Sequence, residues 1–419
     1  MTDAEPGPGR LDATPPRAAS TARAKRRGRG RRRHTVAKVL LATVVAMALV
    51  TGLSVVYLYR ELSGNLNVVE VGDRLQDRPD VVDVAGSREP LNVLVMGSDT
   101  REGEGNDIDG ESGAAASDTT ILFHFSADRE RAYGVSIPRD SMVDRPACDR
   151  GEIPAEDYQM WNEAFSIGGP ACTIQQFEQL TDLRIDHYVV LDFNGFRDMV
   201  DAVDGVQVCI PETIDDREHG IYLEEGTREI RGKEALNYVR QRYAVGNGSD
   251  IGRMKRQQAF IASMAAKVLS ADTLSRPDRL ISFASAATRS LTVDPGLGNI
   301  GRLAGLAQEF QGIGLDKIKF MTVPWQVDPQ DSNRIVWTDQ ADVLWRKMRN
   351  DEPLSRTLTG TAISAADVPG GPAGPGSGAG DGGDGAGGGG TPSSPSASPQ
   401  QQAAAEQARQ EALDAGLCV

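Results

Sequence analysis

The stretch YVRQRYAVGNGSDIGRMKRQQ (residues 238–258) places five basic side chains close together in a chain whose formal net charge is −14. Arg240 and Arg242 lie two positions apart, directly after a short apolar run. On an extended segment, residues i and i+2 point to the same face. The pattern therefore predicts two guanidinium groups at the end of a strand, both aimed at one place.

The second half of this stretch predicts the start of a helix after a Gly/Asn/Ser loop at 246–249. Asp250, Arg253 and Gln257 are three and four positions apart, so they would share one helix face. A strand-end arginine pair that faces a helix start suits an anion with several oxygens, such as a pyrophosphate. The alternative is a solvated basic surface, which is the usual role of a charge run.

The N-terminal part of the chain predicts a membrane anchor. Residues 1–36 form a basic tail too poor in apolar residues to fold, and they are expected to be disordered. Val39–Tyr59 is an almost charge-free run that would span about 32 Å as a helix, so residues 37–60 are predicted to cross the membrane. The arginine excess before this run places the tail in the cytoplasm and the main domain outside the cell membrane, as in a single-pass signal-anchor. A cleaved signal peptide is the alternative, and a basic tail beside an anchor argues against nucleic-acid binding.

Beyond the anchor, composition predicts a polar stalk at 61–87, a folded domain at 88–350, a Gly/Pro/Ser-rich linker at 351–400 and a short tail at 401–419. Apolar strands alternate with amphipathic helices across 88–350, which indicates an α/β sandwich. The predicted strands are 91–96, 121–125, 131–137, 187–193, 206–210 and 317–325, and the predicted helices are 173–181, 195–203, 258–269, 279–290 and 338–349.

The chain has four cysteines, and Cys148 and Cys172 lie in loop-like surroundings where a bridge could form outside the cell. Such a bridge would contribute about 3 kcal/mol in the chain-entropy model. The spacing of the cysteines does not choose between the possible pairings, and Cys209 and Cys418 stay open. No zinc-binding spacing occurs.

Polar residues follow or open three predicted strands: Asp99 with Arg101, then Asp118, then Arg139 with Asp140. Carboxylates suit magnesium, which takes one or two of them with phosphate oxygens, and arginines suit phosphate. Together they predict magnesium-assisted chemistry on a phosphorylated substrate. Taken singly, each carboxylate could equally be a turn or helix cap.

The segment GLGNIG at 296–301 matches a dinucleotide-binding fingerprint. No acidic residue ends the next strand about 20 residues further on, where that fingerprint requires one. The segment therefore indicates a plain loop before a helix.

The order of the motifs GSDTR, SDTT, SIPRDS, NEAFSIGGP, IDHYVVLDFNGF, VDGV, YVRQR and DIGRMKRQQ resembles the LytR-CpsA-Psr family of bacterial cell-envelope proteins, in its actinobacterial form. The resemblance implies a three-layer α/β/α sandwich with a central mixed sheet. It also implies a Mg²⁺-dependent phosphotransferase that moves a glycopolymer from a polyprenyl-pyrophosphate carrier to a peptidoglycan acceptor.

By matching motif, Asp99 and Asp118 would hold Mg²⁺, and either could be the general base. The pyrophosphate would be held by Arg139, Arg240, Arg242 and Gln257, with Asp250 and Arg253 closing the site. The family often has basic residues where this chain has Ala116 and Met160, and Arg101 or Arg145 could compensate.

A lipid tail would need an apolar channel, for which Phe177, Phe193, Phe196 and Phe260 are candidates, with ordinary core packing as the alternative. Two other functions remain open. One is a non-catalytic envelope regulator that binds the lipid pyrophosphate, and the other is a pyrophosphatase acting on the lipid-linked glycan.

Overall fold

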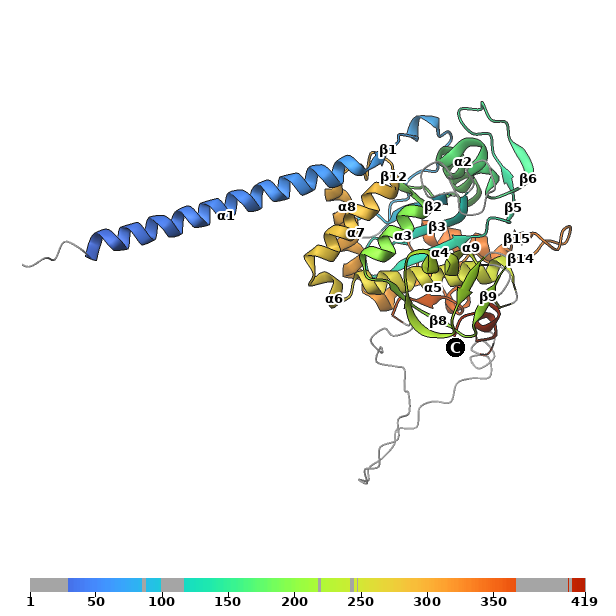
Figure 1. Cartoon of the computed structure of the whole chain (residues 1–419). Coiled ribbons are helices and arrows are strands. Elements are labelled where there is room, and N and C mark those ends of the chain that lie inside the picture. Colours follow the sequence, from blue (N-terminus) through green and yellow to red (C-terminus); the bar gives the residue numbers. More distant parts are fainter. Residues whose placement is uncertain are drawn as a thin grey trace, which may run out of the picture. The chain divides into compact units, whose positions relative to one another are not determined.

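The computed structural model describes residues 29–84, 88–98, 117–217, 220–241, 245–246, 248–366, 406 and 409–418, without the side chains of 29–34, 193 and 194. The chain divides into two compact units, Met1–Leu58 and Tyr59–Val419. The first consists, where it is described, of most of helix α1 (Arg29–Asn65) (Figure 1). The second holds a folded α/β domain.

Helix α1 contains the apolar span Thr35–Asn65, whose most apolar window has a mean hydropathy of 2.5. Its 31 residues correspond to a length that can cross a bilayer, and none of the side chains in that window is buried by the protein. This agrees with a single membrane-spanning helix near the N-terminus, as the run Val39–Tyr59 predicts.

The domain is built on one mixed eight-stranded sheet, with strand order β1-β12-β7-β2-β3-β4-β13-β16. The pairs β1–β12, β7–β2 and β4–β13 are parallel and the other neighbours are antiparallel. The strands are β1 (Asn67–Val68), β2 (Leu91–Ser98), β3 (Ser117–Phe125), β4 (Ala132–Ile137), β7 (His187–Asp192), β12 (Leu291–Val293), β13 (Ile318–Thr322) and β16 (Ile363–Ser364).

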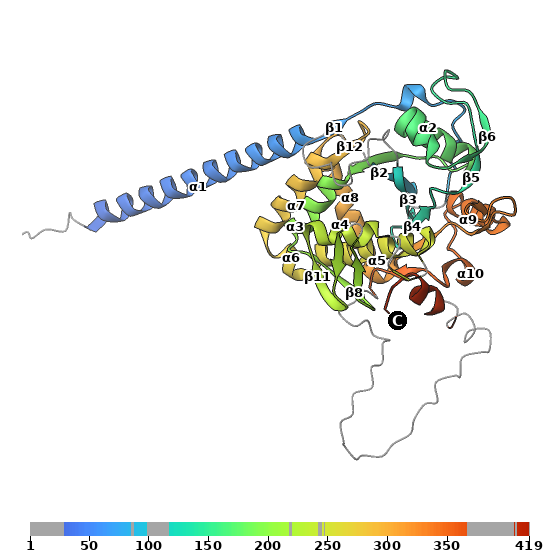
Figure 2. The ribbon, with the colours of Figure 1, turned by 45° about the vertical axis from the view of Figure 1, so that its right-hand side comes forward.

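Helices lie on both faces of the sheet (Figure 2). Alternation along the strands sends side chains to both of these layers. Leu94 and Met96 of β2 enter a core with α2 (Glu163–Thr181) and α9 (Asp339–Arg349). Val93 and Val95 face the other way and pack with α5 (Asp250–Val268) and α8 (Ile300–Ile313). The three-layer α/β/α sandwich with a central mixed sheet is therefore confirmed.

Smaller elements surround this sandwich. A second cluster of buried apolar side chains, which includes Val206, Tyr238 and Phe260, joins several of them to α5. The helices are α3 (Phe193–Ala202), α4 (Gly232–Arg240), α6 (Ala271–Leu274), α7 (Pro277–Ser290) and α10 (Arg356–Thr359). The strands are β5 (Met142–Arg145), β6 (Glu156–Met160), β8 (Val206–Ile210), β9 (Ile214–Asp216), β10 (Ile221–Leu223), β11 (Gly226–Ile230), β14 (Trp325–Val327) and β15 (Ile335–Trp337).

The predicted strand before Arg240 is wrong, because this segment is helix α4. Ala235, Leu236, Tyr238 and Val239 are buried on one side of that helix. Their spacing also fits a helical period of 3.6 residues, so two adjacent apolar pairs did not distinguish a strand from a short helix. Arg240 lies in the last turn of α4 rather than at a strand end.

Residues 66–79, expected to belong to a stalk, are part of the domain. Strand β1 extends the sheet beside β12, and Val71 is buried in the main core. Arg78 donates to the carboxylate of Glu178 and to the carbonyl oxygen of Ile185. These contacts explain why a polar segment with few apolar residues is nevertheless ordered.

The folded part also extends beyond residue 350, where a linker was expected. Helix α10 and strand β16 follow, and β16 pairs with β13 at the edge of the sheet. Ala365 is fully buried beside it. The described domain therefore continues to residue 366.

Two disulfides connect the four cysteines. Cys148–Cys172 is present as expected, and Cys209 of β8 pairs with Cys418. The second bridge spans 209 positions and attaches the C-terminal tail, residues 409–418 of the described chain, to the domain. In the segment at 296–301, residues 296–299 precede α8, Asn299 caps that helix, and residues 300 and 301 are its first two.

We predict that Arg78→Ala destabilises the domain by about 3 kcal/mol, because it leaves a buried carboxylate without its countercharge. The Glu178 side chain has no exposed surface, and Arg78 is its ion-pair partner at 2.5 Å. Denaturant unfolding of the full chain in detergent measures the change.

Arg88→Ala is the matched control, because Arg88 is exposed and Glu309 keeps its ion pair with Arg129. Loss of the Arg88–Glu309 pair should therefore cost less than about 1 kcal/mol. Equal stability losses in the Arg78→Ala and Arg88→Ala variants would show that residues 66–79 do not stabilise the domain through the Arg78–Glu178 pair.

Candidate functional site

One edge of the sheet gathers the polar residues predicted at strand ends. Strands β2 and β4 end there and the antiparallel β3 begins there, because Ser98 pairs with Ser117 and Thr120 with Ile137. Asp118 therefore lies at the start of β3 beside the segment that follows β4. This confirms the expectation that Asp118 and Arg139, 21 positions apart, meet in space.

An ion pair between these two residues forms the centre of the site. Arg139 Nη1 donates to Asp118 Oδ1 at 2.6 Å, and only 17% and 24% of the two side chains is exposed. Arg139 Nε lies 3.7 Å from Asp140 and 3.6 Å from Asp250, too far for hydrogen bonds. Within the described chain this buried Nε donates to no acceptor, so a ligand oxygen would complete its hydrogen bonding.

The first turn of α5 supplies the second part of the site. Ser249 caps the helix by accepting a hydrogen bond from the backbone of Gly252 at 3.0 Å. Asp250 and Arg253, three positions apart, form an ion pair of 2.6 Å with 13% and 6% of their side chains exposed. The helix face predicted from their spacing is confirmed, and the partial positive charge of the helix N-terminus adds to the arginines.

The arginine cluster of the site consists of Arg139 and Arg253 with their carboxylate partners Asp118 and Asp250. Neighbouring charges shift the pKa values of Asp118 and Arg139. Burial disfavours an ionised Asp118, but the charge and hydrogen bond of Arg139, with the charges of Arg253 and Arg240, outweigh burial and lower its pKa. Burial likewise opposes the charge on Arg139, but Asp118 and Asp250 outweigh it and raise its pKa. Both pKa shifts favour the charged forms, an Asp118 carboxylate beside an Arg139 guanidinium.

Gln257 lies next to this cluster and connects two elements. Its amide nitrogen donates to Val239 O at 3.1 Å, and its amide oxygen accepts from Thr119 Oγ1 at 3.2 Å. The side chain thus joins the end of α4 to the start of β3. This places Gln257 at the site, where its amide is engaged by protein partners.

Arg256 is a structural residue that the sequence reasoning missed. Its side chain is buried, and it donates to the carbonyl oxygens of Gln241 and, at 2.7 Å, Ala415. Burial lowers its pKa to about 10. It holds the segment after Arg240 against the C-terminal tail, and a basic run in the sequence carries no signal for such a buried role.

Several predicted residues cannot be placed, or lie elsewhere. Asp99, Arg101, Ala116 and Arg242 are outside the described residues. Arg145 does not compensate at the site, because its buried guanidinium donates to Pro154 O and Glu156 Oε2. Met160 ends β6 and is partly exposed.

An apolar cavity of about 110 Å³ begins beside Thr119 and Gln257 and is lined further by Val95, Phe196 and Ile261. A second cavity of about 360 Å³ shares Val95 and Ile261 with it, so the two adjoin. Its other lining residues are apolar and come from β2, β3, β7 and helices α5, α7 and α8. An apolar passage therefore begins beside the arginine cluster and runs between the sheet and one helical layer.

Of the four phenylalanines considered for such a passage, Phe196 and Phe260 line it. Phe177 does not, because it is buried in the core on the opposite face of the sheet. Its ring centroid lies 5.5 Å from that of Trp345. The side chain of Phe193 is outside the description.

The residues present fit a magnesium ion in part. Asp118 is ionised and partly exposed, as a carboxylate ligand of magnesium must be. The described residues contain no group of three or more metal-ligating side chains, and an ion that takes one or two carboxylates with phosphate oxygens requires none.

Comparison with known proteins places this geometry in context. A model described as the LytR_cpsA_psr family matches residues 56–350. The chain is 34% identical over 267 residues to the probable cell wall biosynthesis protein LcpB of Corynebacterium glutamicum, covering 62% of this chain and 61% of LcpB. It is 27% identical over 301 residues to the polyisoprenyl-teichoic acid–peptidoglycan teichoic acid transferase TagV of Bacillus subtilis, covering 70% of this chain and 71% of TagV.

Solved structures share the fold. Protein gbs0355 from Streptococcus agalactiae superposes with a TM-score of 0.52 at 22% identity, over 64% of this chain and 91% of that one. B. subtilis TagV gives a TM-score of 0.50 at 24% identity, over 64% of this chain and all of the other. The chain spans less than two thirds of the length of LcpB.

We predict that Asp118→Asn reduces stability at pH 7, and that the difference from wild type shrinks as the pH falls below about 4. A carboxyl whose folded pKa is lowered contributes stability above its unfolded pKa and loses it as the pH falls through the folded pKa. Denaturant unfolding at a series of pH values measures this.

Asp198→Asn, a change at an exposed position on α3, is the control and should leave the pH profile unchanged. A difference between Asp118→Asn and wild type that stays constant from pH 7 to pH 3 would contradict the lowered pKa of Asp118.

Proposed function

The chain belongs to the LytR-CpsA-Psr family, and from this we propose that it transfers a glycopolymer from a polyprenyl-pyrophosphate carrier to peptidoglycan. One observation carries the proposal: two largely buried arginines, one after β4 and one in the first turn of α5, lie next to an apolar passage. A polyprenyl pyrophosphate has the same division, a diphosphate at one end and a hydrocarbon chain at the other.

The charged end of the site suits a diphosphate. Arg139 and Arg253 are held by carboxylates in a largely buried setting, so their orientation is set before a ligand arrives. The buried Nε of Arg139, which has no hydrogen-bond acceptor in the described part of the protein, can donate to a phosphate oxygen. The backbone N–H groups at the start of α5 add further donors.

The apolar end suits a polyprenyl chain. Val95 and Ile261 line both parts of the passage, and the residues beyond them are aliphatic and aromatic. Burying a hydrocarbon chain there is favourable by about 0.8 kcal/mol per CH₂. The names of the relatives support the reaction class, since TagV is a teichoic acid transferase and LcpB a probable cell wall biosynthesis protein.

In the proposed reaction, a hydroxyl of the acceptor attacks the phosphorus that carries the glycopolymer. A new P–O bond forms, the bond to the bridging oxygen breaks, and polyprenyl phosphate leaves. Arg139 and Arg253 stabilise the charge that develops on the leaving phosphate. A bound magnesium ion, held by Asp118 and Asp99, would neutralise part of the diphosphate charge.

The electrostatics of Asp118 bear on its role in the proposed reaction. A general base works best with a pKa near the operating pH, whereas the pKa of Asp118 is lowered by its arginine neighbours. Asp118 is therefore suited to orienting Arg139 and to ligating a cation. In this proposal the hydroxyl proton passes to a group other than Asp118.

The same proposal includes the location of the domain. The apolar span of α1 would anchor the chain once in the cell membrane, with the basic tail in the cytoplasm. Both disulfides belong to the other side, because such bridges persist outside the reducing cytosol. The domain would then meet lipid-linked donors at the outer leaflet.

The test is a reconstituted transfer assay with the full chain in detergent, a lipid-linked glycopolymer, peptidoglycan and magnesium. Arg139→Gln is expected to reduce transfer by about a hundredfold, since it removes charge stabilisation from the leaving phosphate. Arg289→Gln, at an exposed position on α7, is the charge-matched control and should retain wild-type activity.

Product analysis separates the alternatives. Glycopolymer joined to peptidoglycan supports the transferase, whereas release of phosphorylated glycopolymer into water would indicate a pyrophosphatase. Binding of the lipid donor by the wild-type chain without any turnover would contradict the enzyme and favour a regulator.

A second prediction concerns the passage. Ile261→Trp would fill the point where the two cavities adjoin. We expect it to weaken binding of a long-chain polyprenyl pyrophosphate by about tenfold while leaving inorganic pyrophosphate binding unchanged. Ile281→Trp on the exposed side of α7 is the size-matched control. Equal weakening for both ligands, or for neither, would place the lipid elsewhere.

A further inference from the structure

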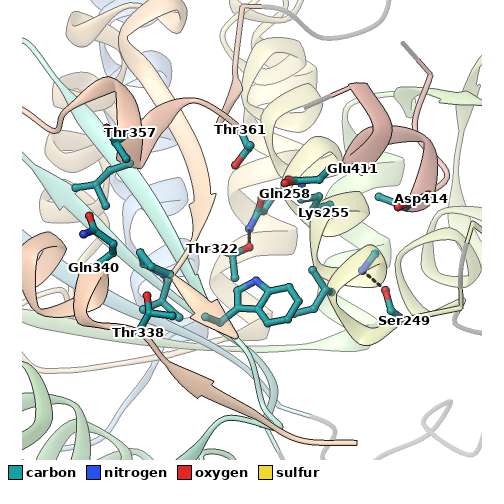
Figure 3. A pocket seen from close by; sticks show the side chains of 17 residues that line it. Ser249, Lys255, Gln258, Thr322, Thr338, Gln340, Thr357, Thr361, Glu411 and Asp414 are labelled. Atoms are coloured by element: carbon teal, nitrogen blue, oxygen red, sulfur yellow. Dashed lines mark hydrogen bonds and ion pairs between the residues drawn. The ribbon is translucent and has the colours of Figure 1, made fainter. Parts of the chain in front are cut away.

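A third cavity, of about 530 Å³, lies on the neighbouring face of the α5 N-terminus and is separate from the apolar passage. Four parts of the chain line it: the first turns of α5, the segment from the end of β13 to β14, the region from α9 to α10, and the C-terminal tail. Figure 3 shows Thr338, Gln340 and Thr357 across the cavity from Glu411 and Asp414.

The lining is rich in neutral hydrogen-bonding groups. It includes hydroxyls of Thr338, Thr357 and Thr361, the amide of Gln340, and the half-buried indole of Trp325. The hydroxyls and the amide both donate and accept hydrogen bonds, and the indole N–H donates. The ring of Trp325 adds to an apolar surface that Ile251, Val323 and Leu358 also form.

The charges in this cavity make it unlike the arginine cluster. No arginine is among its described lining residues, and its one cation, Lys255, is paired with Glu411. Asp414 adds a further negative charge. A phosphate would therefore be disfavoured here, whereas an uncharged, hydroxyl-rich ligand would not be.

We propose that this cavity binds a neutral saccharide unit of the acceptor glycan. The proposal rests on the transfer function proposed above and specifies where the acceptor is held. Ring hydroxyls and acetamido groups of a sugar are the natural partners of the threonines and Gln340, and the C–H face of a pyranose packs on an indole ring. A few placed polar groups around an aromatic surface are typical of small-molecule sites.

The position of the cavity relative to the arginine cluster supports this assignment. Thr322 at the end of β13 lies beside Ser136 of β4, three residues before Arg139. On α5, Asp250 and Arg253 belong to the arginine cluster, while Gly252 and Lys255 line the cavity. A saccharide in the cavity is thus next to the proposed diphosphate site, separated from it by the first turn of α5.

The C-terminal tail forms one wall, and it is attached to the domain at several points. Cys418 is bridged to Cys209, Lys255 is paired with Glu411, and the carbonyl of Ala415 accepts from Arg256. This wall lies beyond residue 350, where the family match ends. The cavity is therefore shaped in part by a segment outside the matched family region, which would give this chain its own acceptor preference.

The experiment measures binding of a tetrasaccharide of N-acetylglucosamine to the full chain in detergent by calorimetry. Wild type should bind it, and the double variant Gln340→Ala/Thr361→Ala should bind about tenfold more weakly, because two exposed hydrogen-bonding side chains are lost. Trp325→Ala should weaken binding independently. Gln330→Ala, at an exposed position outside the cavity, is the control.

Arg139→Gln keeps the two sites distinguishable. It should retain tetrasaccharide binding even though the proposed transfer requires Arg139. In the transfer assay, Gln340→Ala/Thr361→Ala should raise the KM for the acceptor and leave the KM for the lipid donor unchanged.

The proposal is overturned if wild type does not bind the tetrasaccharide, or if the cavity variants bind it as well as wild type does. It is also overturned if only the donor KM rises in the double variant. None of these outcomes depends on the loss of transfer in Arg139→Gln, so the cavity and the transfer function can fail separately.

Discussion

The ion pair between Asp118 and Arg139 is the contact on which the arrangement of the site depends. A guanidinium that is largely removed from water is tolerated only beside compensating charge. The antiparallel pairing of β3 with β4 brings that charge from 21 positions away. Asp250, at the start of α5, faces the same guanidinium. Strand β3, the segment after β4 and the N-terminus of α5 are therefore held together around Arg139.

Helix α5 then connects this charged cluster to the apolar passage. Its first turn carries Asp250 and Arg253, and later turns carry Phe260 and Ile261, which line the cavities beside the sheet. Gln257, between them, ties the helix to Thr119 and Val239. The same helix therefore presents charge at one end and apolar surface further along, which matches an amphipathic ligand such as a polyprenyl diphosphate.

Local patterns predicted much of this arrangement, and distant contacts account for what they missed. The positions of Asp118 and Arg139 followed from strand periodicity, because chain reversals return strand ends to one edge of a sheet. The segment ending at Arg240 is a helix although its sequence predicts a strand, since two adjacent apolar pairs fit both periods. The pairing of Cys209 with Cys418 and the burial of Arg256 depend on the C-terminal tail folding back, which no local pattern specifies.

The central claim is that one lipid diphosphate bridges the arginine cluster and the apolar passage. A structure of the full chain bound to a polyprenyl pyrophosphate tests it directly. The account predicts phosphate oxygens within hydrogen-bond distance of Arg139 Nε, with the hydrocarbon chain running past Val95 and Ile261. A diphosphate bound away from Arg139 and Arg253, or a chain lying outside the passage, would contradict it.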